Sequence, residues 1–166
     1  MRLNSTDRFA VEVRRFRTWL YCGTHKKERA VREALHHVTR LAAAALDLPP
    51  VCWDKLHAEP AVDINRSLRL TSRKPRLHPI NRMPFNHYSL VFNPLVEPPE
   101  KPVFASLNDD LWDLDGDLSR GLVEYNAGNR VRAAWQWESG FRGHWGRHAT
   151  GAIEALRSWL EVHSKN

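Results

Sequence analysis

The sequence predicts an all-α fold: an irregular four-helix bundle in which a long proline-rich crossover, with a short extended segment, joins two helical hairpins. All ten prolines lie between Pro49 and Pro102, and proline removes a helical amide donor and clashes with the preceding turn. Both proline-free flanks carry apolar residues at helical spacing, and two such hairpins bury these residues best against each other. The predicted parts are one domain over 1–166, a hairpin over 5–47, the crossover over 48–105 and a hairpin over 106–163.

The first hairpin is predicted from two apolar stripes on either side of Gly23. The first stripe steps by four, three and four residues and comprises Phe9, Val13, Phe16 and Leu20. Gly23 ends this helix, and Thr24 can cap a second helix that runs to about Leu46. Pro49 and Pro50 then close the hairpin. The second stripe comprises Val31, Leu35, Val38, Leu41, Ala42 and Ala45.

The second hairpin begins at Ser106, which is a typical N-cap residue. Asp109 and Asp110 follow in the first turn, where carboxylates suit the positive end of the helix dipole. Gly128 supplies the stop, and Asn129 caps a fourth helix that runs to about residue 162. The stripe of the third helix is Leu107, Leu111, Leu114, Leu118, Leu122 and Tyr125. That of the fourth is Ala134, Trp137, Phe141, Trp145, Ala152, Leu156 and Trp159.

Three glycines in the fourth helix need a reason, because each costs about 1 kcal/mol relative to alanine inside a helix. They are Gly140, Gly143 and Gly146. Either another segment packs very close to them or the helix is locally irregular. We expect the first explanation, with residues 87–94 as the approaching segment. Residues 87–95 alternate weakly between apolar and polar, which predicts a short extended piece packed on the bundle.

Composition favours a reduced, membrane-free environment. Cys22 and Cys52 stand alone without C-x-x-C spacing, so neither a disulfide framework nor a thiolate zinc site is indicated. Residues 1–20 are charged and lack the apolar run that a signal peptide or a membrane span requires. We therefore expect a cytoplasmic protein that does not enter a membrane.

The net charge of +6 comes from one stretch. Residues 64–96 contain six of the 25 cations and no acid, and the remaining 19 cations equal the 19 acids. The six are Arg66, Arg69, Arg73, Lys74, Arg76 and Arg82. Such a stretch can contact nucleic-acid phosphates or an acidic protein partner, although residues 66–82 hold no aromatic side chain for base stacking. A basic loop that is merely solvated is the alternative.

Two histidines and three aspartates form the strongest candidate for chemistry. His144 and His148 lie one helical turn apart, and Asp110, Asp113 and Asp117 form a matching column on the preceding helix. Together they could bind zinc, manganese or iron. The favoured interpretation is that each histidine pairs with a carboxylate on the neighbouring helix without any metal. Acid–base catalysis is a third possibility.

The sequence also predicts a groove over the fourth helix. Bare glycine backbone would form its floor and indole rings would cover it, since large aromatics suit a half-buried surface. The candidate groove residues are Trp137, Phe141, Trp145 and, from the crossover, His87.

Two segments carry a resemblance to a known family. "VFNPLVEPPEKPVFASLNDDLWDLDGDLSRGL" and "AAWQWESGFRGHWGRHATGAIEAL" resemble an uncharacterised bacterial family classed as a domain of unknown function. In that family an SL-x-DDL-x-D helix precedes a tryptophan-rich helix that ends in HWG-x-HA. The similarity covers roughly residues 86–160. It implies a bacterial source and the pairing of these helices, and it carries no activity.

These observations favour a non-enzymatic binding or accessory protein that acts on an unknown protein partner through the crossover and the groove over the fourth helix. Two alternatives stay open. The first is a metal-dependent enzyme built on His144, His148 and the aspartates. The second is a nucleic-acid-binding accessory protein that uses the basic stretch.

Overall fold

The computed structural model describes residues 4–22, 27–51, 56, 62–65, 67 and 83–164. Its helices are α1 (Ser5–Cys22), α2 (Lys27–Ala45), α5 (Leu107–Asn126), α6 (Arg130–Gly140) and α7 (Gly146–His163). A π-helix, η2 (Phe141–Trp145), joins α6 to α7. The strands β1 (His87–Leu90) and β2 (Val103–Ser106) pair antiparallel. The predicted all-α class is confirmed, with a single two-stranded sheet among the described residues.

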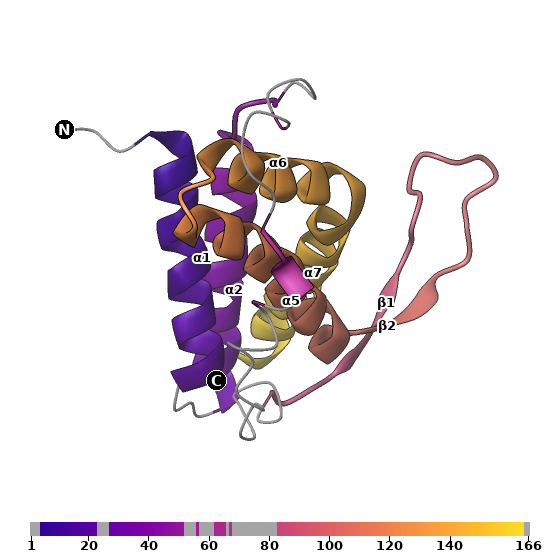
Figure 1. Cartoon of the computed structure of the whole chain (residues 1–166). Coiled ribbons are helices and arrows are strands. Elements are labelled where there is room, and N and C mark those ends of the chain that lie inside the picture. The colour runs from indigo at the N-terminus through magenta and orange to yellow at the C-terminus, as the bar shows by residue number, and fades with distance from the viewer. Residues whose placement is uncertain are drawn as a thin grey trace.

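The helices pack as two hairpins (Figure 1). α1 packs on α2, α5 packs on α6, and α7 contacts both α2 and α5. The chain bends at η2, so that α6 crosses one end of the bundle and α7 runs back beside α5. The strands leave the bundle as a projecting ribbon. None of the helices in the described part of the chain combines the length and apolarity needed to cross a membrane.

The predicted boundaries of α5 are confirmed by its capping contacts. Ser106 has an extended backbone and its side chain accepts a hydrogen bond from the Asp109 amide, as an N-cap residue does. Asn86 adds a second cap, because its Oδ1 lies 2.9 Å from the Asn108 amide nitrogen. At the other end Gly128 has a φ of +91°, which glycine adopts without strain.

Two further capping predictions have different outcomes. Asn129 occupies the N-cap position of α6, but its side chain makes no capping hydrogen bond. The side-chain nitrogen of Asn129, Nδ2, instead donates to Glu124 Oε2 at 2.7 Å, because Glu124 is buried and a buried carboxylate needs a donor. Gly23 and Thr24 lie outside the described residues.

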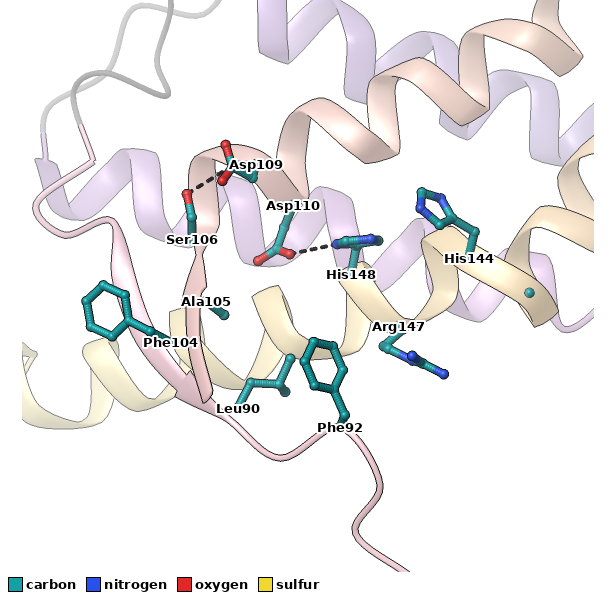
Figure 2. A pocket seen from close by; sticks show the side chains of 11 residues that line it. Leu90, Phe92, Phe104, Ala105, Ser106, Asp109, Asp110, His144, Arg147 and His148 are labelled. Carbon is teal, nitrogen blue, oxygen red and sulfur yellow. Dashed lines mark hydrogen bonds and ion pairs between the residues drawn. The ribbon is translucent and has the colours of Figure 1, made fainter. Parts of the chain in front are cut away.

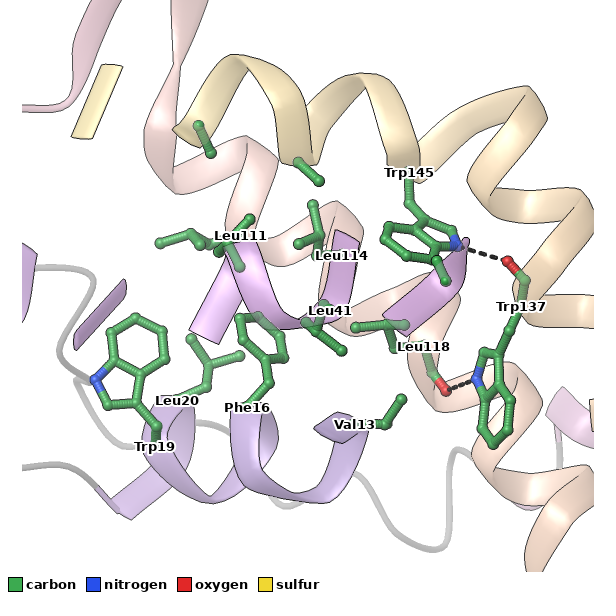
Figure 3. Close-up of a cluster of buried hydrophobic side chains, with 14 of the residues drawn as sticks. Val13, Phe16, Trp19, Leu20, Leu41, Leu111, Leu114, Leu118, Trp137 and Trp145 are labelled. Atoms are coloured by element: carbon green, nitrogen blue, oxygen red, sulfur yellow. Dashed lines mark hydrogen bonds between the residues drawn. The ribbon is translucent and has the colours of Figure 1, made fainter. Parts of the chain in front are cut away.

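The core is built from the predicted stripes. Phe9, Val13 and Phe16 are fully buried with the α5 leucines from Leu107 to Leu118. Trp137 and Trp145 complete this core (Figure 3). Each indole N–H is satisfied internally: Trp137 donates to the Leu118 carbonyl and Trp145 to the Trp137 carbonyl, both at 3.0 Å. Buried indoles need such partners.

Gly143 lies in the π-helix and Gly140 and Gly146 flank it. The expected close approach of residues 87–94 at these positions is wrong. A Cβ on Gly146 would lie 2.1 Å from the Phe141 carbonyl oxygen, and one on Gly140 would lie 2.9 Å from the Trp145 ring. A Cβ on Gly143 would meet nothing within 4 Å. The wider π turn brings its own backbone and rings against Gly140 and Gly146, so the local irregularity of the helix is the correct explanation.

Two glycines of α5 give a matched test of the core. A Cβ on Gly121 would lie 2.3 Å from the Trp137 Nε1. Gly121→Ala should therefore destabilise the protein by about 1–3 kcal/mol through overpacking. A Cβ on Gly116 would meet nothing within 4 Å, so Gly116→Ala should stabilise it by up to about 1 kcal/mol. Denaturant unfolding of both variants measures these changes in the free energy of unfolding. Equal changes in the two variants would contradict the close contact between Gly121 and Trp137.

Candidate functional site

A cavity of about 280 Å³ lies between the strands and the α5 and α7 helices (Figure 2). One wall is apolar and comes from the strands and the segment between them: Leu90, Phe92, Phe104 and Ala105. The other wall is polar and comes from the helices and the segments flanking them: Ser106, Asp109, Asp110, Gly143, His144, Arg147 and His148. An apolar cleft with a few convergent polar groups is the usual form of a ligand site.

Asp110 lies at the base of this cavity and is only 5% exposed. Its Oδ2 accepts a hydrogen bond from the Tyr88 hydroxyl at 2.6 Å, and its Oδ1 lies 2.9 Å from His148 Nδ1. Burial raises the pKa of Asp110, and the hydrogen bonds from Tyr88 and His148 offset part of the rise. Burial and the neighbouring carboxylate also raise the pKa of Tyr88. One carboxylate thus links β1, α5 and α7.

Tyr88 reaches Asp110 because α7 carries glycine where the ring passes. A Cβ on Gly151 would lie 2.5 Å from the Tyr88 hydroxyl and 3.6 Å from the Leu90 Cδ1. The strand therefore approaches the fourth helix closely at Gly151, one helical turn beyond His148. Any larger residue there would displace the hydroxyl from Asp110.

The two histidines bond different carboxylates through the same ring atom. His144 Nδ1 lies 2.7 Å from Asp117 Oδ2, whereas His148 Nδ1 faces Asp110. The other nitrogen of His148, Nε2, lies 3.6 Å from Asp113 Oδ2, which is too long for a hydrogen bond. The two imidazole ring centres are 4.9 Å apart.

The π-helix places His144 between two cavities. His144 and Gly143 line the cavity already described and also a second one of about 260 Å³. The other residues of the second cavity are Asp117, Arg120, Gln136, Ser139 and Gly140. π-Helical turns are rare and occur often at functional sites, so their coincidence with the paired histidines singles out this part of the molecule.

The structure brings together the five residues predicted as a metal or pairing cluster. His144 pairs with Asp117, and His148 lies between Asp110 and Asp113. Within the part of the chain that the structure describes, no three His, Cys, Asp or Glu side chains are placed to hold one metal ion. Metal binding and acid–base catalysis stay predictions.

The residues predicted for the groove do not line this cavity. Trp137 and Trp145 are fully buried in the core, as members of the predicted apolar stripe of the fourth helix. Phe141 packs on that core. His87 is exposed on β1 and stacks on Phe104 with ring centres 4.7 Å apart. The six predicted basic contacts, Arg66, Arg69, Arg73, Lys74, Arg76 and Arg82, lie outside the described residues.

Several residues that line or support the cavity could not be found from the sequence. Tyr88 and Gly151 form a contact 63 residues apart along the chain, and only the alternation of residues 87–95 hinted that the tyrosine faces inward. Phe92 and Arg147 form a second such contact, because the Arg147 guanidinium carbon lies 5.7 Å from the Phe92 ring centre. No sequence motif indicates either of these two contacts.

A double-mutant cycle tests the contact between Tyr88 and Gly151. In the wild type, Gly151→Ala should expel the Tyr88 hydroxyl and cost about 1–3 kcal/mol, because Asp110 loses a buried hydrogen bond. In a Tyr88→Phe background the hydroxyl is absent, and the same alanine should gain up to about 1 kcal/mol of helix propensity. Denaturant unfolding of the four proteins measures the coupling. Additive effects would show that the two residues act independently.

The titration of Asp110 gives a second test. Its pKa in the folded protein should exceed the ordinary value of 3.8 because the carboxylate is buried. The raised pKa of Asp110 therefore contributes to the free energy of unfolding. This contribution is full below pH 3.8, the ordinary pKa, and is lost as pH rises through the raised pKa of the folded protein. Tyr88→Phe removes a hydrogen bond that lowers the pKa, so the pKa should rise further and the loss should extend to higher pH. NMR titration of the Asp110 carboxyl carbon measures both values, and a pKa at or below 3.8 would contradict the burial.

Comparison with known proteins extends the resemblance seen in the sequence. A family model described as a domain of unknown function (DUF5063) matches residues 3–161, so the similarity reaches the first helical hairpin as well as residues 86–160. No curated protein and no solved structure shows a significant match. The chain belongs to the family described as a domain of unknown function, DUF5063.

Proposed function

We propose that this is a non-enzymatic binding protein whose ligand enters the cavity between the strands and the α5 and α7 helices. The observation that carries the proposal is the contrast between the two walls. One wall presents solvent-facing aromatic side chains, and the other presents imidazoles held in place by carboxylates. Ligand sites combine apolar contact area with a few fixed polar groups in this way.

The apolar wall supports the proposal through its exposure. Phe92 is 51% and Phe104 77% exposed, although both are large aromatic residues that gain free energy when buried. Leu95 and Val103 of the same ribbon are also exposed. Exposed apolar residues beside a cavity are typical of an interaction surface.

The polar wall supports the proposal through its rigidity. Both oxygens of Asp110 are engaged, one by Tyr88 and one by His148. Asp110 therefore fixes the orientation of the His148 ring and is itself closed to a ligand. A group that is oriented before binding contacts a ligand at a lower entropic cost.

The two alternatives stay predictions. A metal-dependent enzyme would use the free ring nitrogens of His144 and His148, since metal-bound histidines commonly donate their other ring N–H to a carboxylate. A nucleic-acid-binding role would depend on the six basic residues between positions 66 and 82, all of which lie outside the described residues. Metal analysis of protein purified without a histidine tag tests the first, and salt-dependent binding to nucleic acid tests the second.

The proposed function is tested by NMR with a fragment library that contains cationic, anionic and neutral compounds. Fragments should shift the amide signals of residues 88–92 and 143–148 together. Phe92→Ala should weaken the bound fragments about fivefold to tenfold, which is about 1 to 1.4 kcal/mol, because they lose their apolar wall. Val162→Ala is the matched control, since Val162 is 73% exposed at the far end of α7. Shifts that map elsewhere, or no binding at all, would contradict the proposal.

A further inference from the structure

We propose that the cavity binds an organic cation, a primary ammonium group on an apolar stem, with the ammonium between His148 Nε2 and Asp113 Oδ2. The inference rests on the proposed function, because it concerns the same cavity. It adds the chemical class of the ligand and the two atoms that select it.

The first step concerns the hydrogen on the His148 ring. With Asp110 ionised, both of its oxygens only accept hydrogen bonds, and one of them lies 2.9 Å from His148 Nδ1. A neutral ring must therefore carry its hydrogen on Nδ1. Its Nε2 is then an acceptor with an outward-facing lone pair.

The second step concerns the gap beside Nε2. Asp113 Oδ2 lies 3.6 Å away and is also an acceptor. Two acceptors that face each other repel, and no hydrogen bond can form between them. An ammonium nitrogen placed about 2.8 Å from each atom would donate to both. The Asp113 side chain is 47% exposed, so a ligand can reach the gap from solvent.

The third step concerns the surrounding charge. With neutral imidazoles, the charged residues that line the cavity are Asp109, Asp110 and Arg147, and Asp113 adds a further carboxylate at the gap. Figure 2 shows the Arg147 side chain pointing away from the His148 and Asp110 pair. Its guanidinium packs over Phe92 instead. The local field at the gap therefore favours a cation.

The fourth step concerns the stem of the ligand. Leu90 and Phe92 form the opposite wall, and aromatic faces attract both alkyl groups and cations. The volume of about 280 Å³ is close to that of nine water molecules in the liquid. This space accommodates a chain of four carbons and one nitrogen. That chain occurs in a lysine side chain of a partner protein and also in free alkylamines.

The test uses the full chain at pH 8 and low salt, with three probes of similar size: n-butylammonium, 1-butanol and butyrate. Binding is followed by NMR, including the ring nitrogens of His148. The ammonium should bind at least tenfold more tightly than the alcohol or the carboxylate. Asp113→Asn should weaken it at least tenfold, because the amide removes the negative charge at the gap. Glu161→Gln is the matched control and should change affinity less than threefold, because Glu161 lies in the last turn of α7 and does not line the cavity.

The outcomes separate this inference from the proposed function. If fragments map to the cavity but the ammonium has no advantage, or if Asp113→Asn has no effect, the cation is wrong and the binding role stands. If nothing maps to the cavity, both are wrong. Displacement of the ammonium by Zn²⁺ held on His148 and Asp113 would replace the organic cation with a metal and overturn the inference.

A second comparison identifies the source of the ammonium group. Two probes represent a protein partner: Nα-acetyl-lysine-methylamide, whose side-chain ammonium is free, and a short lysine peptide. A third probe, 1,5-diaminopentane, represents a free amine. Tighter binding of the peptide supports a lysine side chain, and tighter binding of the diamine supports a small molecule. Either result supports the ammonium chemistry, whereas failure of all three to compete with n-butylammonium would contradict it.

Discussion

The architecture around the cavity depends on one buried carboxylate, that of Asp110. A carboxylate that is 5% exposed is costly to ionise unless donors compensate it. Tyr88 and His148 supply these donors from β1 and α7. The strand residues are themselves exposed or half-buried, so apolar burial contributes little to their position. The hydrogen bond from Tyr88 therefore ties β1 to the bundle, together with the contact of Asn86 with the first turn of α5.

The helical framework was predictable because it follows from local rules. The leucine stripe of α5 begins directly after the Ser106 cap, and the helix ends two residues before Gly128. Helical period, cap chemistry and the backbone freedom of glycine all act within a few residues of the chain.

The cavity was predictable only in part, because its contacts join distant residues. The column of aspartates and the two histidines could be placed on facing helices by their spacing alone. The contact of Tyr88 with Gly151 could not be predicted, because a single glycine inside a helical pattern does not indicate which residue approaches it. The burial of Trp145 was predicted by its place in the apolar stripe of the fourth helix, whereas the π-helical turn at η2 was only the second of two explanations for the glycines, because helical periodicity assumes a regular turn.

Asp110 and Asp113 differ in burial and in hydrogen bonding, and their spacing in the sequence does not indicate this difference. They lie three residues apart on one helix and flank the same imidazole, so by spacing they are equivalent. Their environments differ: Asp110 is buried with both oxygens engaged, whereas Asp113 is half exposed and stands 3.6 Å from His148 Nε2. The first carboxylate therefore serves to orient the ring, and the second is open to whatever donor enters. In the proposed site, stability and recognition are thus divided between two aspartates. A change in the aromatic wall can then alter which stem is accepted without disturbing the group that holds the fold.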